Sequence, residues 1–332
     1  MGVILGTGAL LGLWIYCKCC RKKASAVADS RVAYAPPAPG APQAPGVHAL
    51  VQMLRERGST DSACAVRLCS DLQDLAADEG GRLACLSAGA VPAVTAVIAA
   101  QVHCAPAVHA ACGALVNITA NCAPAKAACA SSVPLISAAL LAHAAADASV
   151  CLQACWALNH ISSSGGREGA LLQGDALSAL VAAVTAQSNS EDVVRHACEC
   201  FRAAAASALG EAACVKSGAI PALLLALPGH LGSAAVCAAA CGALASMVRE
   251  PAHKEAALAA QALPCLVAVL SAHPADADAG HWGCKALRLL AEGEAAAQAA
   301  AAAGGIAAAV GVIRSQPASE AMSWACDALA TL

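Results

Sequence analysis

One cysteine recurs through the chain at a nearly constant interval, and this recurrence constrains the fold more than any other feature of the sequence. The interval is 43 residues at five of the six steps and 42 at the last. Apolar residues stand three and six positions after each of these cysteines, which is the spacing of one helical face. Each repeat therefore contains one helix at a fixed place. We call these residues the register cysteines, and they are Cys69, Cys112, Cys155, Cys198, Cys241, Cys284 and Cys326.

A second apolar position recurs in parallel and marks a second helix in each repeat. Its members are 42 to 44 residues apart, and proline often follows directly. Proline suits the first turn of a helix, because its fixed φ fits helix entry and its missing N–H has no helical partner there. Segments such as GEAACVKSG indicate a third, shorter helix, and several end at glycine, the usual residue of a left-handed turn. The second-position residues are Val47, Val91, Val133, Leu177, Ile220, Leu263 and Ile306.

A period of about 43 residues predicts a helical solenoid, in which stacked neighbours supply the core that no single unit can bury. Paired-helix families have shorter periods of about 33–34 residues, so we expect three helices per repeat. We predict an all-α domain of about seven three-helix repeats over residues 47–332, with the last repeat truncated. Because the sequence stops within the last register helix, we expect either a longer natural chain or a dimer that covers this end.

Three stretches of the sequence resemble armadillo repeats. They are CGALVNITAN at 112–121, CWALNHISSSG at 155–165 and EAACVKSGAIPALLLAL at 211–227. The first two are similar to the third armadillo helix, small-x-A-L-x-N-I/L, and the last to the repeat boundary, G-A-I-P-x-L-V-x-L-L. The resemblance covers residues 47–332 and implies an armadillo-type helical-repeat solenoid, a right-handed superhelix. It is specific for the fold and not for the function.

The resemblance also implies where a partner would bind. In armadillo proteins the third helices, which the register-cysteine helices of this chain resemble, line a concave groove. A ladder of asparagines in this groove holds extended peptides. The ladder position falls five residues after each register cysteine, where this chain has Asn117, His160 and Ser246. Of the tryptophans that nuclear-import receptors place directly after this cysteine, only Trp156 is present, which argues against a receptor for nuclear localisation signals. These four residues are the groove candidates for a protein or extended peptide, although Asn117 and His160 also fit solvated or capped polar residues.

The composition argues against nucleic acid as a partner. The formal net charge is −3, and four basic residues without any acid lie within the first 23 residues. Binding to phosphates depends on clustered Lys and Arg, and binding to single strands on aromatic stacking platforms. With 2% aromatic residues, the repeats are expected to offer neither.

The cysteines of the repeats are interpreted as small buried hydrophobic residues in a reducing compartment. A secreted disulfide framework is typical of short, loop-rich chains, whereas these cysteines lie in helical apolar stripes. Redox sensing or metal binding is the alternative. Pairs such as Cys198/Cys200 and Cys151/Cys155, however, lack the paired CxxC spacing of structural zinc sites. We therefore expect no metal site.

Motifs of common enzyme classes are missing from the sequence. His103, His109, His160, His196 and His281 form neither HExxH nor a comparable ligand spacing. GxSxG and GxxxxGK[ST] do not occur, and no carboxylate pair recurs that would suggest acid–base chemistry. We therefore expect no catalytic residues, no cofactor and no small-molecule substrate.

Residues 1–23, MGVILGTGALLGLWIYCKCCRKK, differ from the rest of the chain and predict a membrane anchor. The uncharged run from Gly2 to Tyr16 would span about 22–25 Å as a helix, and snorkelling of Lys18 with local thinning can match it to a hydrocarbon core of about 30 Å. Positive charge follows the run, so the positive-inside rule places the repeats in the cytosol. At the membrane edge stand three candidates for palmitoylation, Cys17, Cys19 and Cys20.

Residues 24–46 include AYAPPAPGAPQAPG, whose prolines favour an extended linker. Together with the anchor, the layout resembles a membrane-attached armadillo scaffold. It predicts a non-enzymatic scaffold or adaptor that binds a protein partner in the groove at the cytosolic face of a membrane. The alternative is a soluble cytoplasmic adaptor or assembly chaperone, in which the first 23 residues are an incidental tail.

Overall fold

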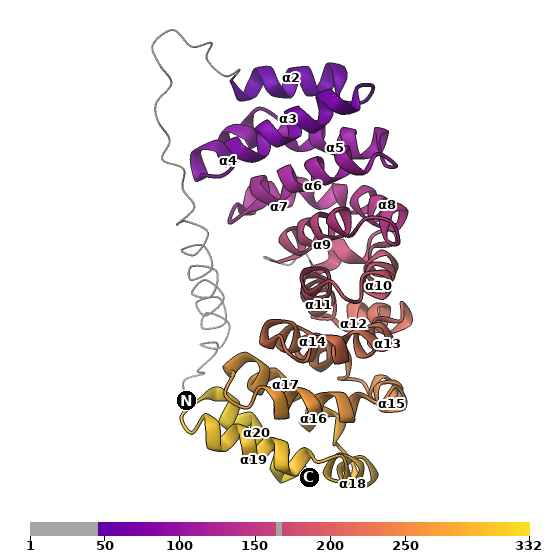
Figure 1. The fold of residues 1–332 in the computed structure, drawn as a ribbon, viewed down its shortest axis with the longest axis vertical. Coiled ribbons are helices and arrows are strands. Elements are labelled where there is room, and N and C mark those ends of the chain that lie inside the picture. The colour runs from indigo at the N-terminus through magenta and orange to yellow at the C-terminus, as the bar shows by residue number, and fades with distance from the viewer. Residues whose placement is uncertain (1–45, 164–167) are drawn as a thin grey trace, which may run out of the picture. The chain divides into compact units, whose positions relative to one another are not determined.

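The structure is a computed structural model that describes residues 46–163 and 168–332. In this part of the chain every regular element is a helix, which confirms the prediction of an all-α repeat fold. The described residues belong to one compact unit that begins at Pro45. The anchor predicted at 1–23 lies outside them, as does the linker predicted at 24–46 except for its last residue. Figure 1 shows the repeats stacked in chain order from α2 (Val47–Arg57) to α20 (Glu320–Thr331).

The first helix of each repeat, here called the A helix, begins at or just before the second recurring apolar position. The A helices are α2 (Val47–Arg57), α5 (Ala90–Ala100), α8 (Val133–His143), α10 (Ala176–Ala186), α13 (Ala219–Ala226), α16 (Ala262–Ala272) and α19 (Gly305–Ser315). Pro92, Pro134, Pro221 and Pro264 all lie in the first turn of an A helix, as the sequence predicts. A 3-10 helix, η3 (Leu227–His230), continues α13.

The second helix of each repeat, here called the B helix, carries the register cysteine. The B helices are α3 (Ser62–Leu75), α6 (Ala105–Thr119), α9 (Ala148–Ser162), α11 (Glu191–Ala204), α14 (Ala234–Met247), α17 (Ala277–Leu290) and α20 (Glu320–Thr331). Aspartates cap several of them. The carboxylates of Asp61, Asp147 and Asp276 accept backbone N–H groups of the first turn at 2.8–3.1 Å, which satisfies donors that have no partner within the helix.

The third, shorter element of the repeat is here called the C helix. The C elements are α4 (Glu79–Ser87), α7 (Ala123–Cys129) with η1 (Ala130–Ser132), η2 (Glu168–Leu172), α12 (Ala208–Lys216), α15 (Pro251–Ala259) and α18 (Glu294–Ala302). The first six repeats have three elements each, in the same order, and the last has the A and B helices, which agrees with the predicted pattern and its truncated last repeat. The next repeat begins where each C helix turns into an A helix.

Left-handed residues make most of these turns from C helix to A helix. Gly89, Gly218 and Gly304 have φ values of 74°, 85° and 97°, and the helices on either side meet at 65° to 73°. Glycine adopts this conformation without the steric cost that other residues bear. Gln261 does so with a side chain, at φ 64° and a bend of 77°. The turn before α8 differs, because Ser132 stays right-handed at φ −84° and α7, η1 and α8 run on without such a bend.

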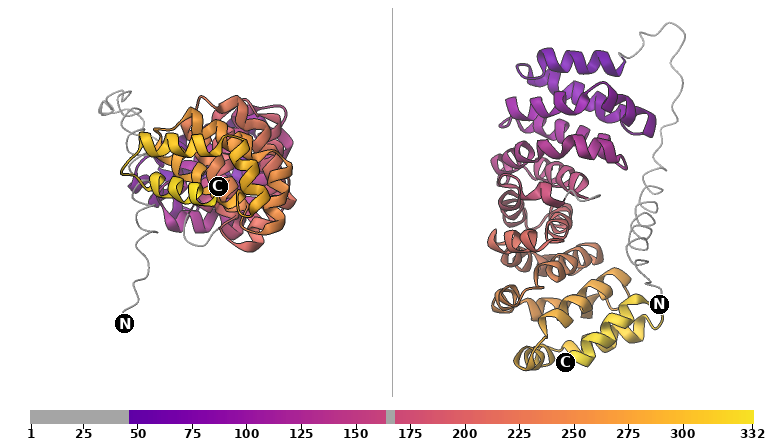
Figure 2. Two further views of the ribbon diagram at one scale, coloured as in Figure 1. Left: turned by 90° about the horizontal axis from the view of Figure 1, so that it is seen from below. Right: turned by 180° about the vertical axis from the view of Figure 1, so that it is seen from behind.

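The B helices pack against one another in order along the stack, from α3 and α6 to α17 and α20. The two further views in Figure 2 show the same order of repeats. Six register cysteines are completely buried in this layer, as predicted. The prediction is wrong for Cys326, which is exposed, because among the described residues α20 packs on the B helix α17 and on no other B helix.

A ladder of Gln and His side chains joins the ends of successive A helices, and the sequence analysis did not detect it. Each Nε2 donates to a carbonyl oxygen of the preceding repeat, and from His143 onward the acceptor is the residue directly after the previous rung. At His143, Gln187, His230 and His273 these bonds are 2.7–2.8 Å long. We call these side chains the Gln/His ladder, and its rungs are Gln101, His143, Gln187, His230, His273 and Gln316.

The Gln/His ladder resolves a problem that every helix end has. The last carbonyl groups of a helix lack a partner within it, and burying them unpaired costs free energy. Gln and His both place an N–H at a similar distance from the backbone, so either residue can serve as a rung. The spacing of the rungs is 42 to 44 residues, and a search of the sequence for Gln or His at the repeat period would have found them.

A buried carboxylate joins α12 to the start of α15. Glu211 is 1% exposed and accepts four hydrogen bonds at 2.9–3.0 Å, from the backbone N–H groups of Arg249 and Glu250, from Arg249 Nε and from His253 Nδ1. Burial by itself would raise the pKa of Glu211, but these donors lower it below its ordinary value. The negative charge stabilises the N-terminus of α15.

One described segment, Ala123–His143, is long and apolar enough to cross a membrane by length and composition. It consists of α7, η1 and α8. Its apolar residues Val133, Ile136 and Leu140 are completely buried in the stack. Part of the apolar surface of this segment is therefore used in the core between repeats.

Burial of the register cysteines predicts how their substitution affects stability. Cys155→Asp is expected to unfold the repeats around it, because it buries a charge without a partner. Cys155→Ala is expected to lower the free energy of unfolding by about 1 kcal/mol. Urea denaturation followed by far-UV circular dichroism measures both changes.

The matched control for this prediction is Cys326→Asp, at the same position of the last repeat but exposed. It should change the stability by less than about 0.5 kcal/mol, as surface substitutions usually do. Equal effects of Asp at Cys155 and at Cys326 would contradict the packing described for the register cysteines.

The Gln/His ladder predicts that a rung can be exchanged but not removed. His230→Gln should leave the free energy of unfolding within about 0.5 kcal/mol, since glutamine occupies three other rungs. His230→Leu, of similar size but without a donor, should cost about 1–3 kcal/mol because the Ser188 carbonyl loses its partner. Thermal unfolding compares the two variants, and equal losses would show that the hydrogen bond contributes nothing.

Candidate functional site

The candidate site residues from the sequence lie on one side of the B helices, here called the B-helix face. We define this face by three residues of each repeat. They are the residue two positions before the register cysteine, the residue one position after it and the residue five positions after it. Cross-repeat packing follows the same rule along the stack. The residue two positions before one register cysteine contacts a residue of the preceding repeat, the one directly after that repeat's register cysteine. His196 packs on Trp156 in this way, and Trp282 packs on Gly242.

Asn117 and His160 make equivalent hydrogen bonds on neighbouring B helices. Asn117 Nδ2 donates to the carbonyl of Gln73 at 2.9 Å, and His160 Nδ1 lies 3.2 Å from the carbonyl of Val116. In both cases the acceptor is the residue just before the ladder position of the preceding repeat. His160 therefore takes the structural role that Asn117 has one repeat earlier. Both side chains are partly exposed, so each can also be reached from solvent.

Trp156 connects two histidines on the B-helix face. Its Nε1–H donates to His160 Nε2 at 2.9 Å, which makes Nε2 an acceptor and places the His160 proton on Nδ1. On α11, the ring of His196 stacks on Trp156 with the centroids 5.4 Å apart and the planes at 14°. Burial, followed by the charge of Lys126, lowers the pKa of His160 to about 4. His160 is therefore neutral at pH 7, as its two hydrogen bonds require.

An ionic network lies beside these rings. Asn159 Nδ2 donates to Glu199, and Arg195 lies 3.6 Å from Glu199 and 2.9 Å from Asp192. Burial by itself would raise the pKa of Glu199, but His196, Arg195 and Asn159 together lower it below its ordinary value. The carboxylate is therefore ionised and held within the stack.

Ser246 is separated from the other three candidates along the stack. Its Oγ donates to the carbonyl of Gly242 in its own helix at 2.9 Å, a bond that serine commonly makes inside helices. The structure therefore brings Asn117, Trp156 and His160 together on α6 and α9 and leaves Ser246 apart on α14. The lipidation candidates Cys17, Cys19 and Cys20 lie outside the described residues.

Two tryptophans that the sequence analysis did not select form a second cluster on the B-helix face. Lys285 Nζ lies 5.1 Å from the ring centroid of Trp282 and 5.2 Å from that of Trp324. Arg202 Cζ lies 5.8 Å from Trp282, and Arg288 Cζ 5.7 Å from Trp324. Distances of this size are typical of cation–π interactions. We call these five residues the tryptophan–cation patch.

The sequence contained a signal for this patch. Trp282 and Trp324 each stand two residues before a register cysteine, so the repeat period alone places them in line. The tryptophan pattern of nuclear-import receptors covers only the position one after the cysteine, where Trp156 stands. Because a helix brings residues three apart to the same side, tryptophans at either position lie on one face.

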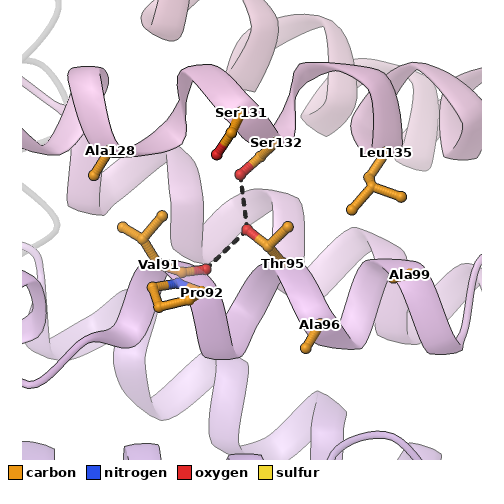
Figure 3. A pocket seen from close by; sticks show the side chains of 9 residues that line it. All are labelled: Val91, Pro92, Thr95, Ala96, Ala99, Ala128, Ser131, Ser132 and Leu135. Atoms are coloured by element: carbon orange, nitrogen blue, oxygen red, sulfur yellow. Dashed lines mark hydrogen bonds between the residues drawn. The ribbon is translucent and has the colours of Figure 1, made fainter.

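A shallow pocket of about 300 Å³ lies on another part of the stack, between α5 and the segment of α7, η1 and α8 (Figure 3). Thr95 Oγ1 donates to the carbonyl of Val91 at 2.8 Å and lies 2.8 Å from Ser132 Oγ. The side chains that line the pocket are those of Val, Leu, Pro, Ala, Thr and Ser, and none of them titrates. The pocket thus offers neither a general acid nor a general base.

Most of the described thiols are made unreactive by burial. All are free, and only Cys104, Cys265 and Cys326 are not buried. Burial raises the pKa of Cys69, Cys112 and Cys284 to about 12, so these thiols stay protonated and are poor nucleophiles. Within residues 46–163 and 168–332, no group of three or more His, Cys, Asp or Glu side chains is arranged to hold a metal ion.

Comparison with known proteins identifies the fold. No protein-family model matches this sequence, and no curated protein matches it. A computationally designed armadillo repeat protein for modular peptide recognition has a TM-score of 0.60 at 21% identity, over 73% of this chain and 99% of the other. A designed armadillo repeat protein in complex with the peptide (KR)4 has a TM-score of 0.51 at 20% identity, over 86% and 98%. An engineered protein has a TM-score of 0.52 at 21% identity, over 87% and 98%.

The lowered pKa of His160 predicts that acid destabilises the stack. The pKa is about 4 in the folded chain against an ordinary value of 6.5, so the unfolded chain binds more protons between these values. The contribution of neutral His160 to the free energy of unfolding is therefore fully present above about pH 6.5, and it is lost as the pH falls toward 4. Between pH 7 and pH 5 the loss should reach at most about 2 kcal/mol.

The variant His160→Asn isolates this effect, because asparagine does not titrate and can donate to Val116 as Asn117 does to Gln73. Melting temperatures of the two proteins across pH 5–7.5 give the comparison. The unsubstituted chain should lose more stability on acidification than the variant. Parallel curves would mean that His160 titrates normally.

Proposed function

Because the described repeats have an armadillo-type fold, we propose that the chain is a non-enzymatic scaffold that binds an extended segment of a protein partner along the B-helix face. The observation that carries the proposal is the repetition of partly exposed polar and aromatic side chains at fixed positions of this face. Each repeat contacts only its neighbours and presents its side chains at a regular interval. Such a surface suits a partner that is itself extended.

The composition of the B-helix face supports this use. Trp156, Trp282 and Trp324, all the tryptophans of the described residues, lie on it and are partly exposed. Tryptophan is enriched at protein interfaces, because it combines a large apolar surface with a hydrogen-bond donor. Rigid placement on packed helices also lowers the entropy that binding must overcome.

Similarity to designed proteins adds an argument by analogy. Those designs are described as serving modular peptide recognition, and one is in complex with (KR)4. Fold alone does not determine function, so the analogy supports a peptide-like partner and says nothing about its sequence.

Several ionisable groups with shifted pKa values support a role without catalysis. His160, Glu199 and Glu211 are each engaged in hydrogen bonds that join successive repeats. A catalytic group needs a reactive atom free to meet a substrate. These three side chains instead use their polar atoms to hold the stack together.

We further propose that the scaffold is attached to the cytosolic face of a membrane through residues 1–23. Support comes from the uncharged run Gly2–Tyr16 followed by Lys18 and the Arg21–Lys23 cluster. Acylation of Cys17, Cys19 and Cys20 would strengthen a short anchor, since two membrane signals hold more firmly than one. A soluble adaptor or assembly chaperone is the alternative.

Site-specific photo-cross-linking of the full chain in cells tests both parts of the proposal. A photoreactive amino acid replaces Asp74 or Ala203, at the ladder position of α3 and α11. We expect adducts with a protein partner, and we expect the adducts to remain in the membrane pellet after extraction with alkaline carbonate. Removing residues 1–23 should move the chain to the supernatant.

Leu209 and Leu225 provide the controls, since they are 79% and 69% exposed and belong to α12 and α13, which are not B helices. The same photoreactive group there should give few adducts. Equal adducts from all four positions would contradict binding along the B-helix face. An unshortened chain found in the carbonate supernatant would support the soluble alternative.

A further inference from the structure

The tryptophan–cation patch is an alternating series of positive charges and indole rings. In order it consists of Arg202, Trp282, Lys285, Trp324 and Arg288, with each cation within 6 Å of a ring centroid. The residues come from α11, α17 and α20, so the patch crosses the B helices in the direction of the stack. A ligand that runs along the stack would meet Arg202 on α11 before Lys285 and Arg288 on α17.

Packing fixes the rings of this patch. A Cβ at Gly242 on α14 would lie 3.3 Å from Trp282 Cδ2 and 3.1 Å from Arg202 Cδ. Glycine therefore lets the Trp282 ring approach α14 closely. On the other side, the ring of His281 lies 4.6 Å from Trp282 and 5.8 Å from Trp324. The patch is held in place before any ligand arrives, which favours binding.

The positive charge of the patch is only partly balanced, by Glu292 beside Arg288 and by Glu320, whose charge acts on Lys285. Within residues 46–163 and 168–332, Arg202 and Lys285 have no carboxylate oxygen within 4 Å. Arg288 shares Glu292 with Lys254. Burial and the nearby charge of Arg288 lower the pKa of Lys285, as expected for a cation among cations.

One hydrogen-bond donor of the patch is also without an acceptor in the described part of the chain. The buried Nε of Arg288 has no acceptor among the described residues, and buried donors are almost always paired in folded proteins. The indole rings, in contrast, already have cations over them. The patch therefore carries positive charge that its own carboxylates balance only in part.

We propose that the tryptophan–cation patch binds an acidic, extended segment of the protein partner. This inference rests on the proposed function and specifies the chemistry of the segment that the C-terminal half of the B-helix face accepts. Carboxylates would pair with Arg202, Lys285 and Arg288, and charge-assisted hydrogen bonds of this type are among the strongest in proteins. The apolar surface of the two rings would cover the peptide between its charged side chains.

Nucleic acid is the less suitable ligand for the same charges. Binding of single strands relies on aromatic faces that are open to stack bases, whereas both indoles here already have two cations within 6 Å. Duplex binding needs a broader set of phosphate contacts. Three cations on two B helices, Arg202 on α11 and Lys285 with Arg288 on α17, offer few phosphate contacts and suit the carboxylates of one short peptide segment.

Fluorescence anisotropy with a labelled peptide tests the inference. The peptide has about 12 residues of alternating Glu and Ser, so that its carboxylates lie on one side of an extended chain about 6.6–7 Å apart. The full chain, in detergent micelles, should bind it at least about ten-fold more tightly than the same peptide with Lys for Glu, and more weakly at high salt. Lys285→Glu should weaken binding at least about ten-fold, and Lys285→Arg should retain it.

The matched control is Arg57→Glu, an exposed arginine on the A helix α2 and so outside the B-helix face. It should bind the acidic peptide with an affinity within about two-fold of the original. Melting curves establish that each variant folds, and Lys285→Met replaces Lys285→Glu if the latter does not.

Equal affinity for the acidic and basic peptides, or unchanged binding by the folded Lys285 variant, would overturn the inference. Tighter binding of a thymidine oligonucleotide, lost in the Lys285 variant, would assign the patch to nucleic acid and overturn it as well. The scaffold proposal is tested separately. Adducts from Asp74 without affinity for the acidic peptide would remove only the charge preference, whereas loss of both would remove the two proposals together.

Discussion

Close packing of small apolar side chains between successive B helices is the interaction on which the rest of this structure depends. Cys69, Cys112 and their equivalents up to Cys284 are completely buried in this layer together with alanines. Small side chains let helices approach closely but bury little area each. Stability must then be distributed over many similar contacts in series, as is typical of repeat proteins. The fixed distance between B helices also sets the spacing of every side chain on the B-helix face.

Polar groups fix the register between repeats, which the thin apolar core does not determine alone. The Gln/His ladder pairs carbonyls at the ends of A helices, the Glu211 carboxylate holds the start of α15, and Asn117 and His160 join neighbouring B helices. All of these bonds cross from one repeat to the next. They make the register between repeats specific, because a shift of one residue would leave buried donors and acceptors unpaired. Apolar packing favours the stacking of repeats in any register, and these hydrogen bonds select one register.

Periodicity explains which features could be predicted from the sequence. The register cysteines, the proline-marked helix starts and the glycine turns depend on local spacing, and the structure has them where the sequence predicts. Exposure of Cys326 depends on whether another helix covers α20, and spacing within a repeat does not report this. The pairing of Trp282 with Gly242, and the proton position on His160, depend on contacts between repeats. These contacts become visible in sequence only when several positions of the repeat are compared at once.

Burial of nearly all described thiols has a consequence for how unfolding of the chain can be monitored. Cys326 at one end of the stack is open to a thiol reagent, whereas the other register cysteines become reactive only when the helices around them separate. In a linear array, opening that starts at one end reaches these cysteines one after another, 43 residues at a time. Alkylation combined with mass spectrometry would therefore read the position of an unfolding boundary directly from the native sequence, without any introduced probe.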